Sequence, residues 1–360
     1  MKKNLCKTTK CSFLQANLRA MGYFFRFWYR VIKTALYIIF NRKRETKRAY
    51  ALLDEIEARF GGRFTPATRK KIAVSYGIYT PMICDAFTAL HGRRTTLGER
   101  QRYIHYFVCS SLFDDFTDII ALPENELLAL SFEPESFTPR SFDEAVFRTS
   151  HLLLKDFVAD KDAYTGVARE LFQAQWDSKQ QAQSRLSDEE IRAITFAKGG
   201  NSVLLCSYYV EFASTYIEKD CWYRIGTIIQ LTNDLFDIYK DTQDHIDTLP
   251  TRIRDVRVFE AFFSEQILGM QTQVRALPVP ERHKGAFRLA MAGIYAFGLI
   301  ALDQLKALQG DASELPALDS LPRKALIIDM EKRRNLAAWL RYTYRYARPT
   351  PPPWPSSGKP

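Results

Sequence analysis

Two stretches of the sequence place several carboxylates within otherwise apolar helical patterns, and carboxylates can bind cations or act as acids and bases. The first stretch is SSLFDDFTDII, residues 110–120. In a helix, Asp114 and Asp118 are about one turn apart and Asp115 lies three residues before Asp118, so all three can lean into one cavity. The flanking residues are apolar or aromatic, which predicts a buried helix rather than a solvated one.

The second stretch is IGTIIQLTNDLFDIYKD, residues 225–241. Asn233, Asp237 and Asp241 recur every four residues, and Asp234 lies beside them. Their neighbours are again apolar at helical spacing, so this helix is expected to pack in the protein interior. Two such helices in one chain favour a shared function for their polar residues.

Neighbouring buried carboxylates are strongly unfavourable, because desolvation and like-charge repulsion add, unless cations neutralise them. The two stretches therefore predict a metal centre. Oxygen donors without Cys or His select a hard ion, so we expect several Mg²⁺ ions, with Mn²⁺ as an alternative. Because Mg²⁺ usually takes one or two carboxylates and keeps phosphate oxygens, two facing helices could hold a diphosphate through it. The expected ligands are Asp114, Asp115, Asp118, Asn233, Asp237 and Asp241.

The elements that would position these residues are helices. From about residue 49 to 347, apolar residues recur at spacings of three and four, and Pro and Gly residues mark the breaks. We therefore predict an all-α protein, a single-domain helical bundle over residues 49–347 with a central cavity. Residues 348–360, RPTPPPWPSSGKP, contain too much proline for regular structure and are expected to form an extended tail.

The amino-terminal segment, residues 1–48, is basic and aromatic, and two interpretations fit it. Within residues 21–40, Arg26, Arg30 and Lys33 are too central for a transmembrane span. These three charges share one helical face and a basic run follows, as in a helix that lies in a membrane interface. The alternative is a helix that packs its aromatic face on the bundle. Because we find no secretory signal, we expect a cytoplasmic protein, attached peripherally to the inner face of the membrane under the first interpretation.

Composition narrows the expected partners. The formal net charge of +10 favours an acidic partner, such as an anionic membrane surface or a phosphorylated small molecule. We expect no nucleic acid partner, because the sequence has no motif of a nucleic-acid-binding fold and its basic residues are spread along the chain. The six cysteines include no CxxC pair, and four of them occur in apolar stretches, as buried thiols of a reduced protein do.

These motifs resemble those of the class I isoprenoid synthases, which include terpene synthases, squalene and phytoene synthases and chain-elongating prenyltransferases. DDFTD at 114–118 is similar to their first motif, DDxxD. NDLFDIYKD at 233–241 lies between the NDxx(S/T)xxxE of terpene synthases and the DxxxD of squalene and phytoene synthases, and the preceding QLTN is similar to the latter type. Asp237 and Asp241 stand where terpene synthases place Ser or Thr and Glu, and the paired arginine of elongating enzymes does not follow the first motif. The resemblance covers about residues 50–347.

The resemblance also implies basic residues that bind the diphosphate. Elongating prenyltransferases carry a lysine on the helix before the second motif, and terpene synthases carry a diphosphate-sensing arginine in that region and an Arg-Tyr pair near the carboxyl end. The matching residues here are, in that order, Lys198, Arg185 or Arg192, and Arg341 with Tyr342, which we favour over Arg345 with Tyr346 on the same helical face. Each of them can also be an ordinary surface side chain.

Two further features concern the walls of the expected cavity. Gly199 and Gly200 interrupt a helical pattern beside Lys198, and such a pair predicts a kink that opens backbone groups to the cavity, or a close approach to a ligand. The 25 Phe and 18 Tyr would suit a pocket that encloses a polyprenyl chain and stabilises carbocations by its ring faces, although most of these rings must belong to the core.

The function that the resemblance implies is that of a Mg²⁺-dependent class I terpene synthase, a carbon–oxygen lyase. Such an enzyme ionises an allylic prenyl diphosphate, releases diphosphate and cyclises the carbocation. One alternative is a squalene or phytoene synthase-like enzyme that condenses two prenyl chains head to head. A further alternative is a non-catalytic helical protein that binds membranes or acidic partners through its amino terminus.

Overall fold

The regular elements of the protein are helices. The computed structural model describes residues 2–183 and 186–348, with the backbone alone for residues 2–24 and 26. Within these ranges it contains no strand, which confirms the predicted all-α class. The α-helices are α1 (Lys2–Phe60), α2 (Pro66–Tyr79), α3 (Asp85–Leu90), α4 (Leu97–Asp118), α5 (Glu124–Phe132), α6 (Phe142–Phe157), α7 (Lys161–Asp177), α8 (Asp188–Leu205), α9 (Tyr216–Gln243), α10 (Val256–Ala276), α11 (Glu281–Gln309), α12 (Arg323–Leu326) and α13 (Arg333–Tyr346).

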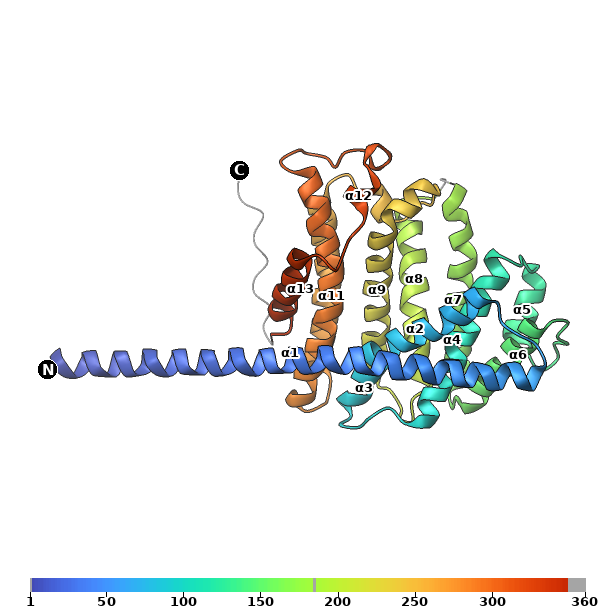
Figure 1. Ribbon diagram of the computed structural model, residues 1–360, viewed down its shortest axis with the longest axis horizontal. Coiled ribbons are helices and arrows are strands. Elements are labelled where there is room, and N and C mark those ends of the chain that lie inside the picture. The colour runs from blue at the N-terminus through green and yellow to red at the C-terminus, as the bar shows by residue number, and fades with distance from the viewer. Residues whose placement is uncertain (1, 184–185, 349–360) are drawn as a thin grey trace.

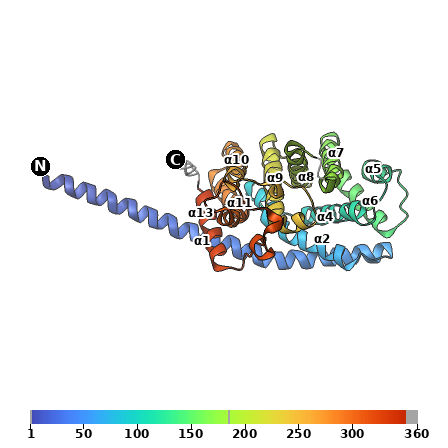
Figure 2. The same ribbon diagram turned by 90° about the horizontal axis from the view of Figure 1, so that it is seen from above.

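The helices pack in two layers. Helices α10, α9, α8 and α7 stand side by side in one row, and α11, α2, α4 and α6 form the layer beneath it (Figures 1 and 2). Helix α1 is 59 residues long, and it runs along the outside of the second layer and continues well beyond the bundle. The two predicted carboxylate stretches lie on α4 and α9, which belong to different layers.

The three helices that carry most of the candidate residues begin at clear sequence signals. In each, a Ser or Thr hydroxyl accepts a hydrogen bond from the backbone N–H three residues on, and the Glu at that position accepts one from the backbone N–H of the capping residue. This capping box satisfies two N–H groups that a helix start leaves unpaired, and it fixes the first turn. The pairs are Thr96 and Glu99 for α4, Ser187 and Glu190 for α8, and Thr215 and Glu218 for α9.

Glycines let α8 and α9 pack very closely. A Cβ atom on Gly199 would lie 2.7 Å from the backbone oxygen of Gly226 and would overlap Gln230, and one on Gly200 would overlap the ring of Tyr223. Because α8 continues without interruption from Asp188 to Leu205, the kink predicted at the glycine pair is wrong. The close approach is to the backbone of α9, since only glycine leaves room for two helices at this distance.

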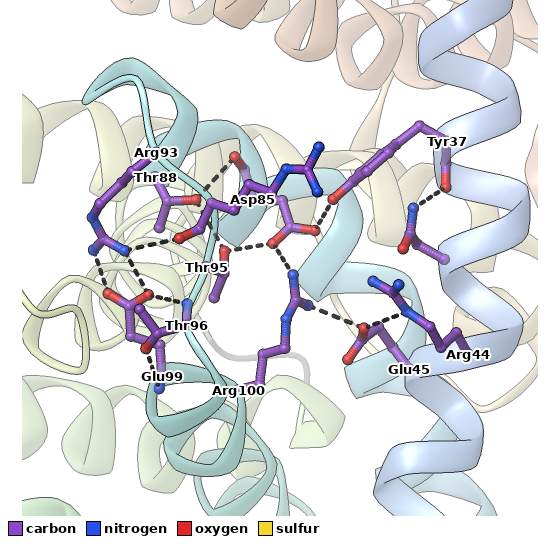
Figure 3. A network of polar contacts seen from close by, with 12 residues as sticks. Tyr37, Arg44, Glu45, Asp85, Thr88, Arg93, Thr95, Thr96, Glu99 and Arg100 are labelled. Carbon is purple, nitrogen blue, oxygen red and sulfur yellow. Dashed lines mark hydrogen bonds and ion pairs between the residues drawn. The ribbon is translucent and has the colours of Figure 1, made fainter.

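A buried network of charges fixes α1 to the bundle (Figure 3). The Arg100 guanidinium of α4 lies 2.8 Å from Asp85 Oδ1 and 3.3 Å from Glu45 Oε1, and all three side chains are buried. The Tyr37 hydroxyl donates to Asp85 Oδ2 at 2.6 Å, and the Tyr76 hydroxyl donates to Glu45 Oε2 at 2.7 Å. The predicted boundary after residue 48 therefore falls inside a continuous helix whose middle part is already attached to the bundle.

Other apolar stretches behave as core. Among the described residues, α11 alone has the length and apolar content of a membrane-crossing helix, and 78% of its most apolar window is buried inside the protein, which is the setting of a core helix. The thiols of Cys84, Cys109, Cys206 and Cys221 are buried and free, as the sequence predicts for cysteines in apolar stretches.

Candidate active site

The first predicted motif contains a partly buried carboxylate, Asp114, whose side chain is 34% exposed. Asp114 Oδ2 lies 2.7 Å from Lys71 Nζ of α2, and Gln175 Nε2 donates to Asp114 Oδ1 at 3.3 Å. Burial raises the pKa of Asp114 above its ordinary value, the charges of Lys71 and Lys198 oppose this shift, and the like charge of Asp118 adds to it. Asp118 is the last residue of α4 and is exposed, so the motif ends at the protein surface.

The middle aspartate of this motif has a separate partner. The Thr68 hydroxyl of α2 donates to Asp115 Oδ2 at 2.6 Å. Burial raises the pKa of Asp143 on α6, and the charge of Asp115 contributes to that increase. Asp114 lines a cavity that Asp115 does not reach. The structure thus brings Asp114 and Asp118 together but turns Asp115 toward the start of α2.

The second motif contains two buried carboxylates. Burial raises the pKa of Asp234 to about 7, against a hydrogen bond that Gln230 Nε2 donates to Asp234 Oδ1 at 2.8 Å. Burial also raises the pKa of Asp241 to about 6, and the like charge of Asp237 adds to it. The positive charges near these two carboxylates do not offset the cost of burying their ionised forms. Such groups are suited to binding a cation.

The remaining polar residues of the second motif face another way. Asn233 and Asp237 are exposed, and both line a cavity together with Arg42 of α1. The four-residue spacing predicted from sequence is present on α9, but its members divide between two directions. Asp234, which was not among the expected ligands, is more buried than Asn233 beside it.

Lys198 of α8 lies between the two motifs. Burial raises the pKa of Asp114 on α4 and of Asp234 and Asp241 on α9, and the Lys198 charge opposes that shift in all three. Lys198 also lines one cavity together with Asp114 of the first motif and with Gln230, which donates a hydrogen bond to Asp234 of the second motif. The inner residues of the two motifs are therefore connected through the lining of that cavity.

An aromatic cavity of about 210 Å³ extends inward from this place between α4, α6, α7 and α8. Asp114 and Lys198 line it together with Gln175 and Gln230. Most of its remaining surface is apolar, and the rings that line it are Tyr106, Phe113, Phe132, Phe147, His151, Tyr164, Phe172 and Tyr209. Burial lowers the pKa of His151 to about 4, so this ring is neutral near pH 7.

A second cavity, of about 410 Å³, lies on the other side of α9 and contains Asn233 and Asp237. Aromatic rings lie between the two cavities: Tyr79, which lines the second cavity, stacks on Phe107 with ring centres 6.0 Å apart. Phe107 in turn contacts Tyr106 of the aromatic cavity at 5.5 Å. The carboxylates are thus flanked by two apolar spaces.

The other expected diphosphate-binding residues lie elsewhere. Arg192 is exposed at the start of α8, and Arg185 is outside the described residues. The Tyr342 hydroxyl of α13 donates to Asp303 Oδ2 of α11 at 2.7 Å, and Arg341 Nη2 lies 3.4 Å from the same oxygen. The structure does not bring this pair to the carboxylates of α4 and α9.

The donors at the site suit a hard cation that arrives with its own ligands. Among the described residues, no group of three or more Asp, Glu, His or Cys side chains is placed to hold an ion alone. Mg²⁺ needs no such group, because it commonly binds one or two carboxylates and fills its shell with water and phosphate oxygens. The residues that could hold it beside Asp114 and Asp118 of α4 are Asp234 and Asp241 of α9, while Asn233 and Asp237 face the second cavity.

Sequence reasoning missed three residues of this site. Lys71 pairs with Asp114 from α2, and nothing in the surrounding run TRKKIAVSY distinguishes it from a surface lysine. Gln175 and Gln230 carry no pattern of their own either. Gln230 precedes Asp234 by one helical turn, so a search for polar residues on the inner face of α9 could have found it.

Comparisons with known proteins add no family to this geometry. The sequence matches no model of a known protein family, and no curated protein is similar to it. The resemblance to isoprenoid synthases therefore depends on the two sequence motifs.

Proposed function

We propose that this protein is a Mg²⁺-dependent class I terpene synthase, which ionises an allylic prenyl diphosphate and cyclises the resulting carbocation. The observation that carries the proposal is the position of Lys198. Lys198 lines an aromatic cavity together with Asp114 of the first motif and with Gln230, which donates a hydrogen bond to Asp234 of the second. Carboxylates from two helices beside a lysine suit a diphosphate with its metal ions better than they suit any uncharged ligand.

The residues of the site have distinct roles in this proposal. Asp114 and Asp118 of α4 would hold the metal together with Asp234 and Asp241 of α9, whereas the expected ligands Asn233 and Asp237 line the second cavity. When bound, Mg²⁺ withdraws charge from the leaving diphosphate as a Lewis acid. Lys71 and Lys198 contribute ammonium groups that can bind diphosphate oxygens, and such donors are most effective where water is excluded.

The aromatic cavity supports the second half of the reaction. Ring faces attract cations, and a dry wall protects a carbocation from capture by water. Lys198 is the one Lys or Arg among the lining residues, and His151 is neutral. The lining therefore contains no second fixed positive charge to repel a cation. The cavity of about 210 Å³ would limit how a chain folds before it cyclises.

A second candidate is head-to-head condensation, as in squalene and phytoene synthases. The observation that favours it is the presence of two apolar cavities on the two sides of the carboxylates, one with Asp114 and the other with Asn233 and Asp237. Two spaces could hold two prenyl chains. The two candidates share the ionisation step and differ in the carbon number of the product.

The test uses purified full-length protein with Mg²⁺ and, in separate reactions, geranyl, farnesyl, geranylgeranyl and longer prenyl diphosphates. Diphosphate release and extracted hydrocarbons are measured. A cyclic product from one substrate supports the terpene synthase, and a product of doubled carbon number supports condensation. No metal-dependent release from any substrate would contradict both and favour the non-catalytic, membrane- or partner-binding alternative.

Adjacent aspartates provide a matched pair of variants for this test. Asp114→Asn should abolish release, since Asp114 lines the cavity and contacts Lys71. Asp115→Asn should retain most of it, because Asp115 binds the Thr68 hydroxyl and an amide oxygen can still accept that bond. Equal loss in both variants would show that Asp115 also acts in the site.

A further inference from the structure

Helix α1 presents a continuous apolar stripe to solvent. The stripe consists of Tyr29, Ile32, Leu36, Ile39 and Phe40, whose exposed fractions are 67, 54, 47, 55 and 68%. Residues spaced by three and four lie on one face of a helix, so these side chains form a single line. Large apolar side chains gathered in this way on a protein surface commonly mark an interaction site.

The orientation of the stripe is fixed by the opposite face of the same helix. Phe27 and Val31 are buried in a small cluster with Leu289 of α11, and Phe27 packs edge-to-face on Tyr344 of α13 with ring centres 4.7 Å apart. Further along, Glu45 is held in the buried charge network (Figure 3). The stripe therefore points away from the bundle. Helix α1 itself runs along the outer side of the bundle (Figure 2).

The charges of this region are all of one sign. The first acidic residue of the chain is Glu45, and the 44 residues before it contain eleven Lys and Arg. The whole chain has 51 Lys and Arg and 41 Asp and Glu. Without the eleven basic residues of this segment, 40 Lys and Arg remain against 41 Asp and Glu, so the rest of the chain is nearly neutral. Lys43 and Lys47 are exposed and continue the line of the stripe, and Arg30 and Lys33 are exposed beside it.

We propose that α1 docks on an anionic membrane surface, with the stripe among the lipid headgroups and the flanking lysines and arginines on the lipid charges. An amphipathic helix with a basic border binds such surfaces by apolar burial and electrostatic attraction together. A second copy of this chain is the poorer occupant. It would bring the same positive charges together with no acidic partner before Glu45, and like charges across an interface are unfavourable.

The space beneath the stripe agrees with a lipid partner. Ile39 also lines an almost wholly apolar cavity of about 190 Å³ between α1, α11 and α13. This cavity shares Ile38, Met82, Ile294 and Phe297 with the cavity that contains Asn233 and Asp237. A docked α1 would thus place the membrane beside an apolar cavity that adjoins the one with Asn233 and Asp237 of the second motif.

The experiment measures binding of the full chain to phosphatidylcholine vesicles with and without phosphatidylglycerol, by co-sedimentation. We expect binding to the anionic vesicles that weakens as salt is added. The double variant Lys43→Gln/Lys47→Gln should bind them about 30-fold more weakly, at about fivefold for each charge. Ile32→Glu/Leu36→Glu should lose binding to the anionic vesicles, since it places two carboxylates in the stripe.

Leu268→Glu is the matched control, because Leu268 on α10 is 50% exposed and distant in sequence from α1. It should bind as the wild type does, and circular dichroism should show all variants folded. Wild-type protein that stays unbound, or stripe variants that bind equally well, would overturn the proposal. So would a wild-type dimer in sedimentation that Ile32→Glu/Leu36→Glu converts to a monomer without any vesicle binding, because a second copy would then occupy the stripe. None of these readouts requires enzymatic activity.

Discussion

The buried aspartate of the second motif should make the metal-free protein less stable as pH rises. Burial raises the pKa of Asp234 to about 7 from an ordinary value of 3.8. The folded protein therefore keeps a proton that the unfolded chain releases between these values. Stability falls wherever the folded state binds more protons than the unfolded state, so Asp234 costs nothing below about pH 4 and its full cost is present above about pH 7.

The variant Asp234→Asn removes this titration and keeps an oxygen that can accept from Gln230, 2.8 Å away in the wild type. Relative to wild type, its free energy of unfolding should rise by about 2.5 kcal/mol between pH 5 and pH 8, since each pKa unit corresponds to about 1.4 kcal/mol. Urea denaturation at both pH values without divalent metal measures this difference. Effects of the amide that do not depend on pH cancel in it.

Asp311→Asn, at an exposed turn after α11, is the control for replacing an aspartate by asparagine. The difference in free energy of unfolding between this variant and wild type should change little with pH. A constant difference for Asp234→Asn from pH 5 to pH 8 would refute the reasoning, because Asp234 would then be ionised in the folded protein throughout. Added Mg²⁺ with diphosphate should stabilise the wild type more at pH 8 than at pH 5, since the ion binds the ionised carboxylate.

Three further predictions concern α8 and the buried charges. Lys198→Met should lower diphosphate release about a hundredfold with the helix content unchanged, and an equal loss in Arg192→Met would contradict the central place of Lys198. Gly199→Ala should lower the stability of the protein to urea, because overpacking costs about 1–3 kcal/mol and exceeds the gain in helix propensity. Gly166→Ala on α7 is the control and should raise the stability, because a Cβ atom there meets nothing within 4 Å. Arg100→Met leaves two buried carboxylates of the α1 network without their shared cation and should cost about 3–5 kcal/mol of unfolding free energy; an unchanged denaturation midpoint would contradict that role.

The helices could be predicted because their signals are local. The periodicity of apolar residues and the capping boxes of α4, α8 and α9 depend on residues within a few positions of each other, and the structure confirms the all-α class. The sequence also placed Asp114 and Asp234 correctly within apolar helices, since one turn of neighbours defines the buried face.

Contacts between distant segments could not be predicted in this way. The sequence around the glycine pair of α8 is the same whether the pair kinks the helix or lets the backbone of Gly226 on α9 approach closely. Only the packing of α9 against α8 determines which of the two occurs. Lys71 reaches Asp114 across 43 positions in the chain, and a lysine in a basic run gives no sign of such a partner. Adjacent residues of a helix point in directions about 100° apart, so the sequence implies that Asp114 and Asp115 cannot both face one way. Which of the two faces the cavity depends on where α2 lies.

The glycine contact between α8 and α9 determines which parts of the site can move. With Gly199 against the backbone of Gly226, the two helices cannot slide or separate without losing their closest contact, so Lys198, Asp234 and Asp241 belong to one rigid unit. Asp114 and Lys71 belong to the α2–α4 pair in the other layer. Any opening that admits a ligand, or closure that expels water afterwards, must therefore change the spacing between these two pairs of helices rather than the arrangement within either.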